Sequence, residues 1–135
     1  EEFHRILKED GIFVALWNPR IIEDNSVLGE IENFILKLQP DLKRNSSGNS
    51  QFTKNLEEKL YDTGLFDNIV CLSSMHKIKI SPKHYLGAWK STNEVQSKLG
   101  KKKFTEFIEF AQSKLVQVSS IEQKYLTKAW VCRKK

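Results

Sequence analysis

An unbroken apolar run, Ile12–Trp17, is the feature that most constrains the fold of this chain. The run is too short for a buried helix and is rich in residues that favour strands. Because it does not alternate with polar residues, it predicts a strand covered on both faces, as in a parallel sheet. Before it, Phe3, Ile6 and Leu7 have helical spacing, and Gly11 follows the helix. A short helix that leads directly into a central strand indicates part of a larger domain.

Further helices and strands follow from the apolar pattern. A helix is expected over residues 27–38, ended by Pro40, and a shorter helix is expected before Gly64. A second strand begins near Ile69, and its later residues alternate, which predicts a half-covered strand near the edge of a sheet. Alternation over residues 125–132 predicts a last strand.

Terminal signals define a helical segment between these last two strands. Ser81 is a capping residue, and Pro82 is the preferred residue at the first helical position, so a helix is expected to begin there. Ser91 and Glu94 have the spacing of a capping box, which predicts a break and a new helix. Apolar residues at helical spacing then predict a long helix over residues 104–118.

The order of these elements predicts an α/β fold. Three strands make a thin sheet for five or six helices, so further strands are expected from outside this chain. The length of 135 residues is the scale of one domain.

Composition excludes several classes of protein. The chain has 39% apolar and 29% charged residues and a net charge of +5, which argues against disorder. No apolar run approaches the roughly 20 residues of a membrane helix, and Glu1 and Glu2 do not suit a signal peptide. We therefore expect a soluble, cytoplasmic protein. Cys71 and Cys132 are isolated from each other and from histidine pairs, which predicts free buried thiols and no metal site.

Three segments resemble class I S-adenosylmethionine-dependent methyltransferases, in the same order along the chain. Arg5–Lys8 with Gly11 resembles the turn that leads into the fifth sheet strand of that family. The segment from Ser81-Pro82 through Tyr85–Ser91 is similar to the helical insert between the sixth and seventh strands of the trans-aconitate methyltransferase type. Tyr125–Lys134 is similar to that group's closing strand.

The resemblance implies that residues 1–135 are the C-terminal part of a single methyltransferase domain. This would be the late-strand portion of a Rossmann-like sheet, with a helical lid insert on the acceptor side over about residues 82–120. The implied cofactor is S-adenosylmethionine, but no Gly-x-Gly-x-Gly loop is present, because the six glycines are dispersed. No cofactor-binding residue can therefore be assigned in this chain. The chain alone is expected to be inactive and to need a missing N-terminal half or a partner chain.

Candidate substrate-binding residues come from two segments. At the end of the first strand, Asn18 and Arg20 could orient a polar or anionic small-molecule acceptor while Trp17 forms a wall of its pocket. The resemblance places Tyr85, Trp89 and Ser91 of the helical insert over the same pocket. An aromatic pair at this spacing is also typical of a helix core.

Other roles and readings stay open. His76 could act as a general base or could be an ordinary exposed histidine. The polar loop Arg44–Ser50 could close over an acceptor or could be a plain surface loop.

Two further classes of function compete with a small-molecule methyltransferase. The basic runs Lys101–Lys103 and Arg133–Lys135, together with the tryptophans, could contact nucleic acid, either in a non-enzymatic binding module or in an RNA methyltransferase. The chain could also be a structural partner that completes its sheet with another chain.

Overall fold

The computed structural model describes residues 1–42 and 53–135 of the chain. The predicted loop Arg44–Ser50 lies outside the described residues, and its role stays a prediction. In chain order the elements are α1 (Glu2–Ile6), β1 (Ile12–Trp17), β2 (Arg20–Ile21), α2 (Val27–Leu38), α3 (Leu56–Asp62), β3 (Phe66–Ile80), α4 (Pro82–Lys90), α5 (Asn93–Leu115) and β4 (Ile121–Lys134).

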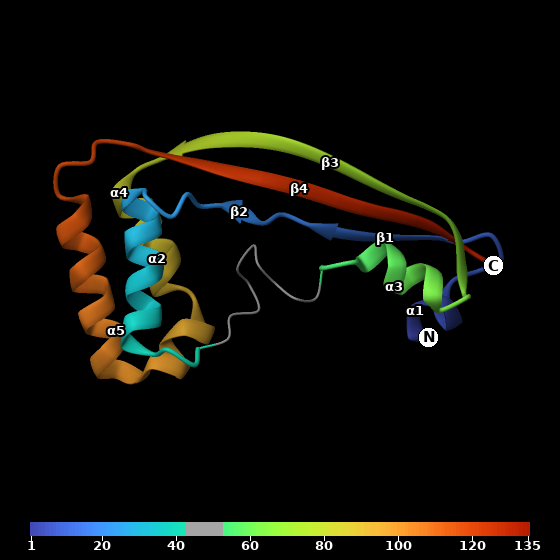
Figure 1. The fold of residues 1–135 in the computed structure, drawn as a ribbon, viewed down its shortest axis with the longest axis horizontal. Coiled ribbons are helices and arrows are strands. Elements are labelled where there is room, and N and C mark those ends of the chain that lie inside the picture. Colours follow the sequence, from blue (N-terminus) through green and yellow to red (C-terminus); the bar gives the residue numbers. More distant parts are fainter. Residues whose placement is uncertain (43–52) are drawn as a thin grey trace. The chain divides into compact units, whose positions relative to one another are not determined.

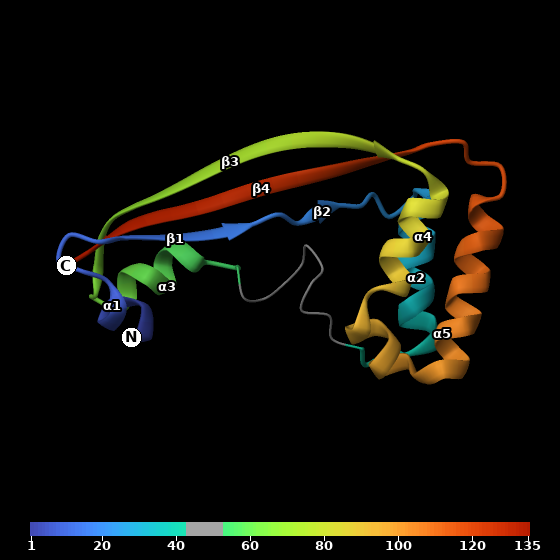
Figure 2. The same cartoon turned by 180° about the vertical axis from the view of Figure 1, so that it is seen from behind.

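The last strand, β4, holds together an open antiparallel sheet. Within the described residues, β1, β2 and β3 all pair with β4. The β1 ladder is antiparallel and runs from Ile12 opposite Arg133 to Trp17 opposite Lys128. Figures 1 and 2 show β4 between β1 and β3, with β1 and β3 pointing the same way. The mixed α/β class predicted from the sequence is therefore confirmed.

The prediction that the first strand belongs to a parallel sheet and is covered on both faces is wrong. The partner of β1 is the antiparallel β4. Only one face of β1 is covered, because Ile12, Val14 and Leu16 are 60%, 53% and 66% exposed while Phe13 and Ala15 pack against a core. The apolar run in the sequence therefore gives one buried face and one apolar face that the described residues leave open.

The chain divides into two compact units, each built from separate segments. Unit 1 comprises residues 1–20, 45–76 and 125–135, and unit 2 comprises residues 21–44 and 77–124. The core of unit 1 lies on the covered sheet face and contains Leu60, Phe66, Trp130 and Cys132. In it, alternate residues of β1, β3 and β4 meet the apolar side of α3.

Unit 2 is a helical unit whose core is formed by α2, α4 and α5. Ile31 and Ile35 of α2 and Phe107 of α5 have no exposed surface. Phe34 and Phe110 stack with ring centroids 3.9 Å apart, which joins α2 to α5. The sequence predicted α2 correctly. Its apolar residues are three or four positions apart, so they form one continuous face of the helix.

The helix signals after β3 are confirmed in part. The hydroxyl of Ser81 accepts a hydrogen bond from the His84 amide, and Pro82 occupies the first turn of α4. The predicted capping box does not form: Thr92 precedes α5, and the Ser91 hydroxyl donates instead to the Ala88 carbonyl. A second kink occurs at Gly100, where φ is +72°.

The described residues contain neither a membrane-spanning helix nor a cluster of metal ligands. None of the described helices has the length and apolar character needed to cross a membrane. Within residues 1–42 and 53–135, no group of three or more histidine, cysteine or acidic side chains is arranged to hold a metal ion.

Gly29 provides a test of packing at the start of α2. A Cβ atom there would lie 2.4 Å from the Glu23 carbonyl oxygen and 2.5 Å from that of Asp24. We therefore expect Gly29→Ala to lower the free energy of unfolding by about 1–3 kcal/mol, because backbone must move to make room. Urea denaturation measures this change.

Gly87 of α4 is the matched control, since nothing lies within 4 Å of the position of its Cβ atom. Gly87→Ala should raise the free energy of unfolding by up to about 1 kcal/mol, because alanine favours a helix. Equal effects of the two substitutions would contradict the close approach at Gly29.

The two cysteines should differ in reactivity. Cys71 is partly exposed, whereas Cys132 is buried, which corrects the prediction of two buried thiols. Burial also raises the pKa of the Cys132 thiol, so less of the reactive thiolate is present at a given pH. We expect iodoacetamide at pH 8 to label Cys71 first, and both thiols to react in urea, as followed by mass spectrometry. Rapid labelling of Cys132 in the folded protein would contradict its burial.

Candidate functional site

Three polar side chains of unit 1 lie in a row near the end of β1. The Thr127 hydroxyl of β4 donates a hydrogen bond to the Asn18 side-chain oxygen over 2.8 Å. On its other side, the same hydroxyl oxygen lies 3.4 Å from Nδ1 of His76 on β3. Pairing of β1 and β3 with β4 therefore brings together three polar residues that are far apart in the sequence.

The hydrogen-bond pattern favours one tautomer of His76. A threonine hydroxyl has one hydrogen, which Thr127 directs to the Asn18 side-chain oxygen. With that hydrogen used, a bond between Thr127 and His76 over 3.4 Å needs the imidazole to donate, which favours the proton on Nδ1. In the neutral ring, Nε2 keeps a free lone pair and can accept a proton from a bound molecule.

An aromatic ring holds the orientation of His76. The imidazole stacks on Tyr125 with ring centroids 5.0 Å apart and an interplanar angle of 6°. Tyr125 and Thr127 are two residues apart on β4, so their side chains are on the same face of the strand. His76, Asn18, Thr127 and Tyr125 thus form a polar cluster, which we call the histidine cluster, on the exposed surface of unit 1.

The six predicted substrate-binding residues divide between the two units. Trp17, Asn18 and Arg20 are in unit 1, and Asn18 belongs to the histidine cluster. Trp17 is half-buried and packs against the unit 1 core. Arg20 is partly exposed at the start of β2.

The other three predicted residues are in unit 2. Tyr85 and Trp89 are each 2% exposed and belong to its core, where the Trp89 ring lies 4.9 Å from that of Phe107. Ser91 is exposed, and its hydroxyl donates to the Ala88 carbonyl. In this structure Tyr85 and Trp89 perform core packing, and their contact with an acceptor stays a prediction.

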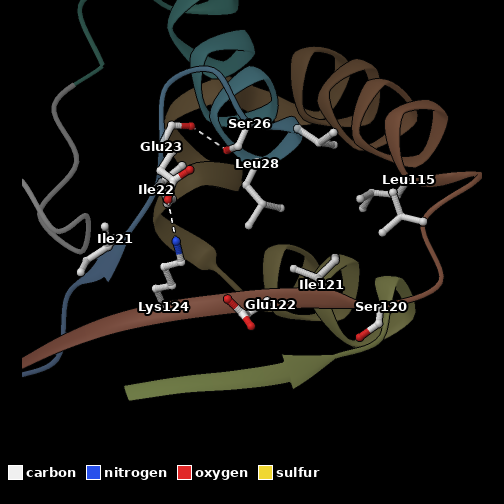
Figure 3. A pocket seen from close by; sticks show the side chains of 12 residues that line it. Ile21, Ile22, Glu23, Ser26, Leu28, Leu115, Ser120, Ile121, Glu122 and Lys124 are labelled. Carbon is white, nitrogen blue, oxygen red and sulfur yellow. Dashed lines mark hydrogen bonds and ion pairs between the residues drawn. The ribbon is translucent and has the colours of Figure 1, made fainter. Parts of the chain in front are cut away.

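Unit 2 contains a pocket of about 320 Å³ (Figure 3). Three segments form its walls: the strand end and loop that lead into α2, the end of α5 with the turn after it, and the first residues of β4. The lining is mostly apolar, and Leu28 and Ile121 face each other across its middle in Figure 3. Its residues are Ile21, Ile22, Glu23, Ser26, Val27, Leu28, Leu115, Val118, Ser120, Ile121, Glu122 and Lys124.

Ion pairs border this pocket. The Lys124 ammonium lies 2.6 Å from a Glu23 carboxylate oxygen, and the Lys77 ammonium lies 3.0 Å from that of Glu122. The hydrogen bond from Lys124 lowers the pKa of Glu23 and raises that of Lys124, and the hydrogen bond from Lys77 lowers the pKa of Glu122. Glu23, Glu122 and Lys124 are therefore charged at neutral pH.

Sequence reasoning missed the pocket and two members of the histidine cluster. Tyr125 and Thr127 are alternate residues of the segment 125–132 that was predicted as a strand, and this shared face was the available signal. The pocket had no comparable signal, because the two stretches that form its walls, residues 21–28 and 115–124, are far apart in the sequence.

Several residues of the two basic runs make contacts with other residues of the same chain. Lys103 donates a hydrogen bond to the Gln39 side chain, and Lys134 donates to the Leu7 carbonyl. The guanidinium of Arg133 lies 3.9 Å from the Asp10 carboxylate. These contacts give part of the two basic runs a structural role, and nucleic-acid binding stays a prediction.

In comparisons with known proteins, no family model and no curated sequence matches this chain. The resemblance to methyltransferases therefore rests on the three segments of the sequence.

The tautomer of His76 can be tested by replacing Thr127. Thr127→Val keeps the shape of the side chain but removes the hydroxyl that accepts from Nδ1. We expect the imidazole proton to move from Nδ1 to Nε2, the site preferred in free histidine, as read from ¹⁵N shifts of the ring. The ring of His84, which is on the surface of α4, should not change and serves as the internal control. An Nε2 proton in the unmodified protein would contradict the assignment.

Proposed function

We propose that this chain is the acceptor-side part of a class I S-adenosylmethionine-dependent methyltransferase that acts on a small molecule. The observation that carries the proposal is the order of strands in unit 1. There β4 is the last strand in the sequence, yet it lies antiparallel between β1 and β3 (Figure 1).

The three sequence segments that resemble this family relate β1 to its fifth strand and place β3 and β4 before and after its helical insert, as the sixth and the closing strand. A helical segment, α4 and α5, connects β3 to β4, as the family's acceptor-side insert connects the sixth and seventh strands. The order of the elements along the chain thus agrees with the order of the resembling segments, which supports the proposal.

The open sheet face of unit 1 also supports a larger fold. Besides the three exposed residues of β1, Val70 and Leu72 of β3 are 50% and 58% exposed. Their neighbours Ile69 and Cys71 pack into the core on the other face, so all five exposed residues share the open face. Contiguous apolar surface of this kind is typical of an interface. We assign this face, and the edge of β1 away from β4, to contact with a cofactor-binding half.

The histidine cluster suits the acceptor side of methyl transfer. S-adenosylmethionine supplies an electrophilic methyl group, and the dispersed glycines of this chain do not fit it, so its binding is assigned to the other half. In this chain, the Asn18 amide and the Arg20 guanidinium would orient a polar or anionic acceptor, beside Trp17. Nε2 of His76 would take the proton that an acceptor hydroxyl loses as an oxygen lone pair bonds to the methyl group, while the electron pair of the broken methyl–sulfur bond stays on sulfur.

The assignment of cofactor binding can be tested by calorimetry on the 135-residue chain. We expect no binding of S-adenosylmethionine at micromolar concentrations, because the chain has no glycine-rich loop. A micromolar dissociation constant for these residues alone would contradict the proposal that they are only the acceptor side.

The role of His76 can be tested in the complete enzyme. His76→Gln should slow methyl transfer at least about 100-fold, because the proton acceptor is lost. His84→Gln is the matched control and should leave the rate unchanged. A normal rate for His76→Gln would exclude His76 as the base, while methyl transfer seen in the same assay would still support the rest of the proposal.

A further inference from the structure

The pocket of unit 2 is not used by the proposed methyl transfer, since the histidine cluster is in unit 1. We infer that this pocket binds a small uncharged molecule with a mainly aliphatic body, and that it selects against charged head groups of either sign. The inference rests on the pocket alone and does not depend on the methyltransferase proposal.

The apolar floor of the pocket is part of the packed core of unit 2. Leu115 and Ile121 are each 4% exposed and belong to that core, and Leu28 packs against it. These three side chains come from α5, β4 and α2, and they point into one space (Figure 3). Because packed side chains hold its walls, the space exists before a ligand enters it.

The volume of the pocket suits a short alkyl chain. Its volume is about 320 Å³, and a water molecule in the liquid takes about 30 Å³, so the space corresponds to about ten groups of that size. Water inside would meet mostly apolar side chains, so an aliphatic ligand gains by displacing it. A chain of the length of 1-octanol fills this space.

The charges at the border of the pocket favour an uncharged ligand. Both lining carboxylates are in ion pairs: a Glu23 oxygen lies 2.6 Å from the Lys124 ammonium, and a Glu122 oxygen lies 3.0 Å from the Lys77 ammonium. A ligand charge of either sign would lie beside both members of a pair, so attraction to one is offset by repulsion from the other. Such a ligand would also lose hydration on entering. An uncharged ligand avoids both costs.

The lining hydroxyl groups add little recognition of a polar ligand. The Ser26 hydroxyl accepts a hydrogen bond from the Gly29 amide and donates one to the Glu23 carbonyl, so its single hydrogen is already used. Ser120 is exposed, so water can satisfy its hydroxyl. The apolar floor therefore provides most of the affinity, and the polar end of a ligand lies at the open side of the pocket.

The test is an NMR titration of the 135-residue chain with 1-octanol, in which the methyl groups of Leu28 and Ile121 report binding. Both signals should shift and saturate, and affinity should rise about fourfold with each methylene from 1-butanol to 1-octanol. The methyl groups of Ile12, on the open sheet face of unit 1, are the internal control for unspecific contact with alcohol and should not saturate. The inference is overturned if Leu28 and Ile121 show no saturable shift up to the solubility limit of 1-octanol, or if Ile12 responds equally.

Two charged probes with the same alkyl chain test the selection for an uncharged ligand. Octanoate and octylammonium should each bind at least about tenfold more weakly than 1-octanol, because their charges gain no net attraction and lose hydration. If either probe binds as tightly as 1-octanol, the pocket does not select against charge.

Two valine variants locate the binding site. Val118→Phe puts an aromatic ring into the pocket lining and should weaken 1-octanol binding at least about tenfold, since the ring takes the space of the ligand. Val116→Phe is the matched control, because Val116 is 79% exposed and is not part of the lining. It should leave the affinity within about twofold.

The methyl spectra of both variants show whether they fold. Val27→Phe, at a lining position that is 40% exposed, takes the place of Val118→Phe if that variant does not fold. Unchanged affinity in the folded pocket variant, or equal losses in it and in Val116→Phe, would overturn the assignment to this pocket.

Discussion

Pairing with β4 is the interaction on which the rest of the structure depends. Among the described residues, every other strand pairs with β4 and with no other strand. The same strand contributes Trp130 and Cys132 to the core of unit 1 and Ile121 to the core of unit 2. Because an unpaired strand leaves its backbone groups without partners, β1 and β3 gain their place only when the end of the chain is present. Both candidate sites follow from it, since Thr127 and Lys124 are also residues of β4.

Patterns among neighbouring residues predicted the helices well. Most of the wrong predictions concern pairing between strands that are far apart in the sequence. Ser81-Pro82 and the apolar face of α2 were correct because a cap and a helical face depend on neighbouring residues. The apolar run Ile12–Trp17 was correctly predicted as a strand, but its direction and its open face were not. Its partner β4 comes from the opposite end of the sequence, and nothing in the run specifies which strand will pair with it.

The candidate sites show the same limit. Asn18 was predicted from its position at the end of a strand, but its hydrogen-bond partner Thr127 is 109 positions away. His76 was a candidate base from its chemistry alone, and the structure adds the contacts that orient its ring. Tyr85 and Trp89 were predicted to bind an acceptor, although aromatic residues at helical spacing are equally typical of a core. The structure places both residues in the core of unit 2. The pocket of unit 2 combines two stretches that are far apart in the sequence, residues 21–28 and 115–124, and no sequence pattern predicted it.

The central claim is that β1, β4 and β3 are the late strands of a methyltransferase sheet whose cofactor is held by residues outside this chain. Photo-crosslinking of S-adenosylmethionine to the full product of the reading frame that contains this chain tests it most directly. The labelled peptides should map outside these 135 residues, to a segment with a glycine-rich loop after a strand. A full product that takes up no label, or label that maps within these 135 residues, would contradict this assignment.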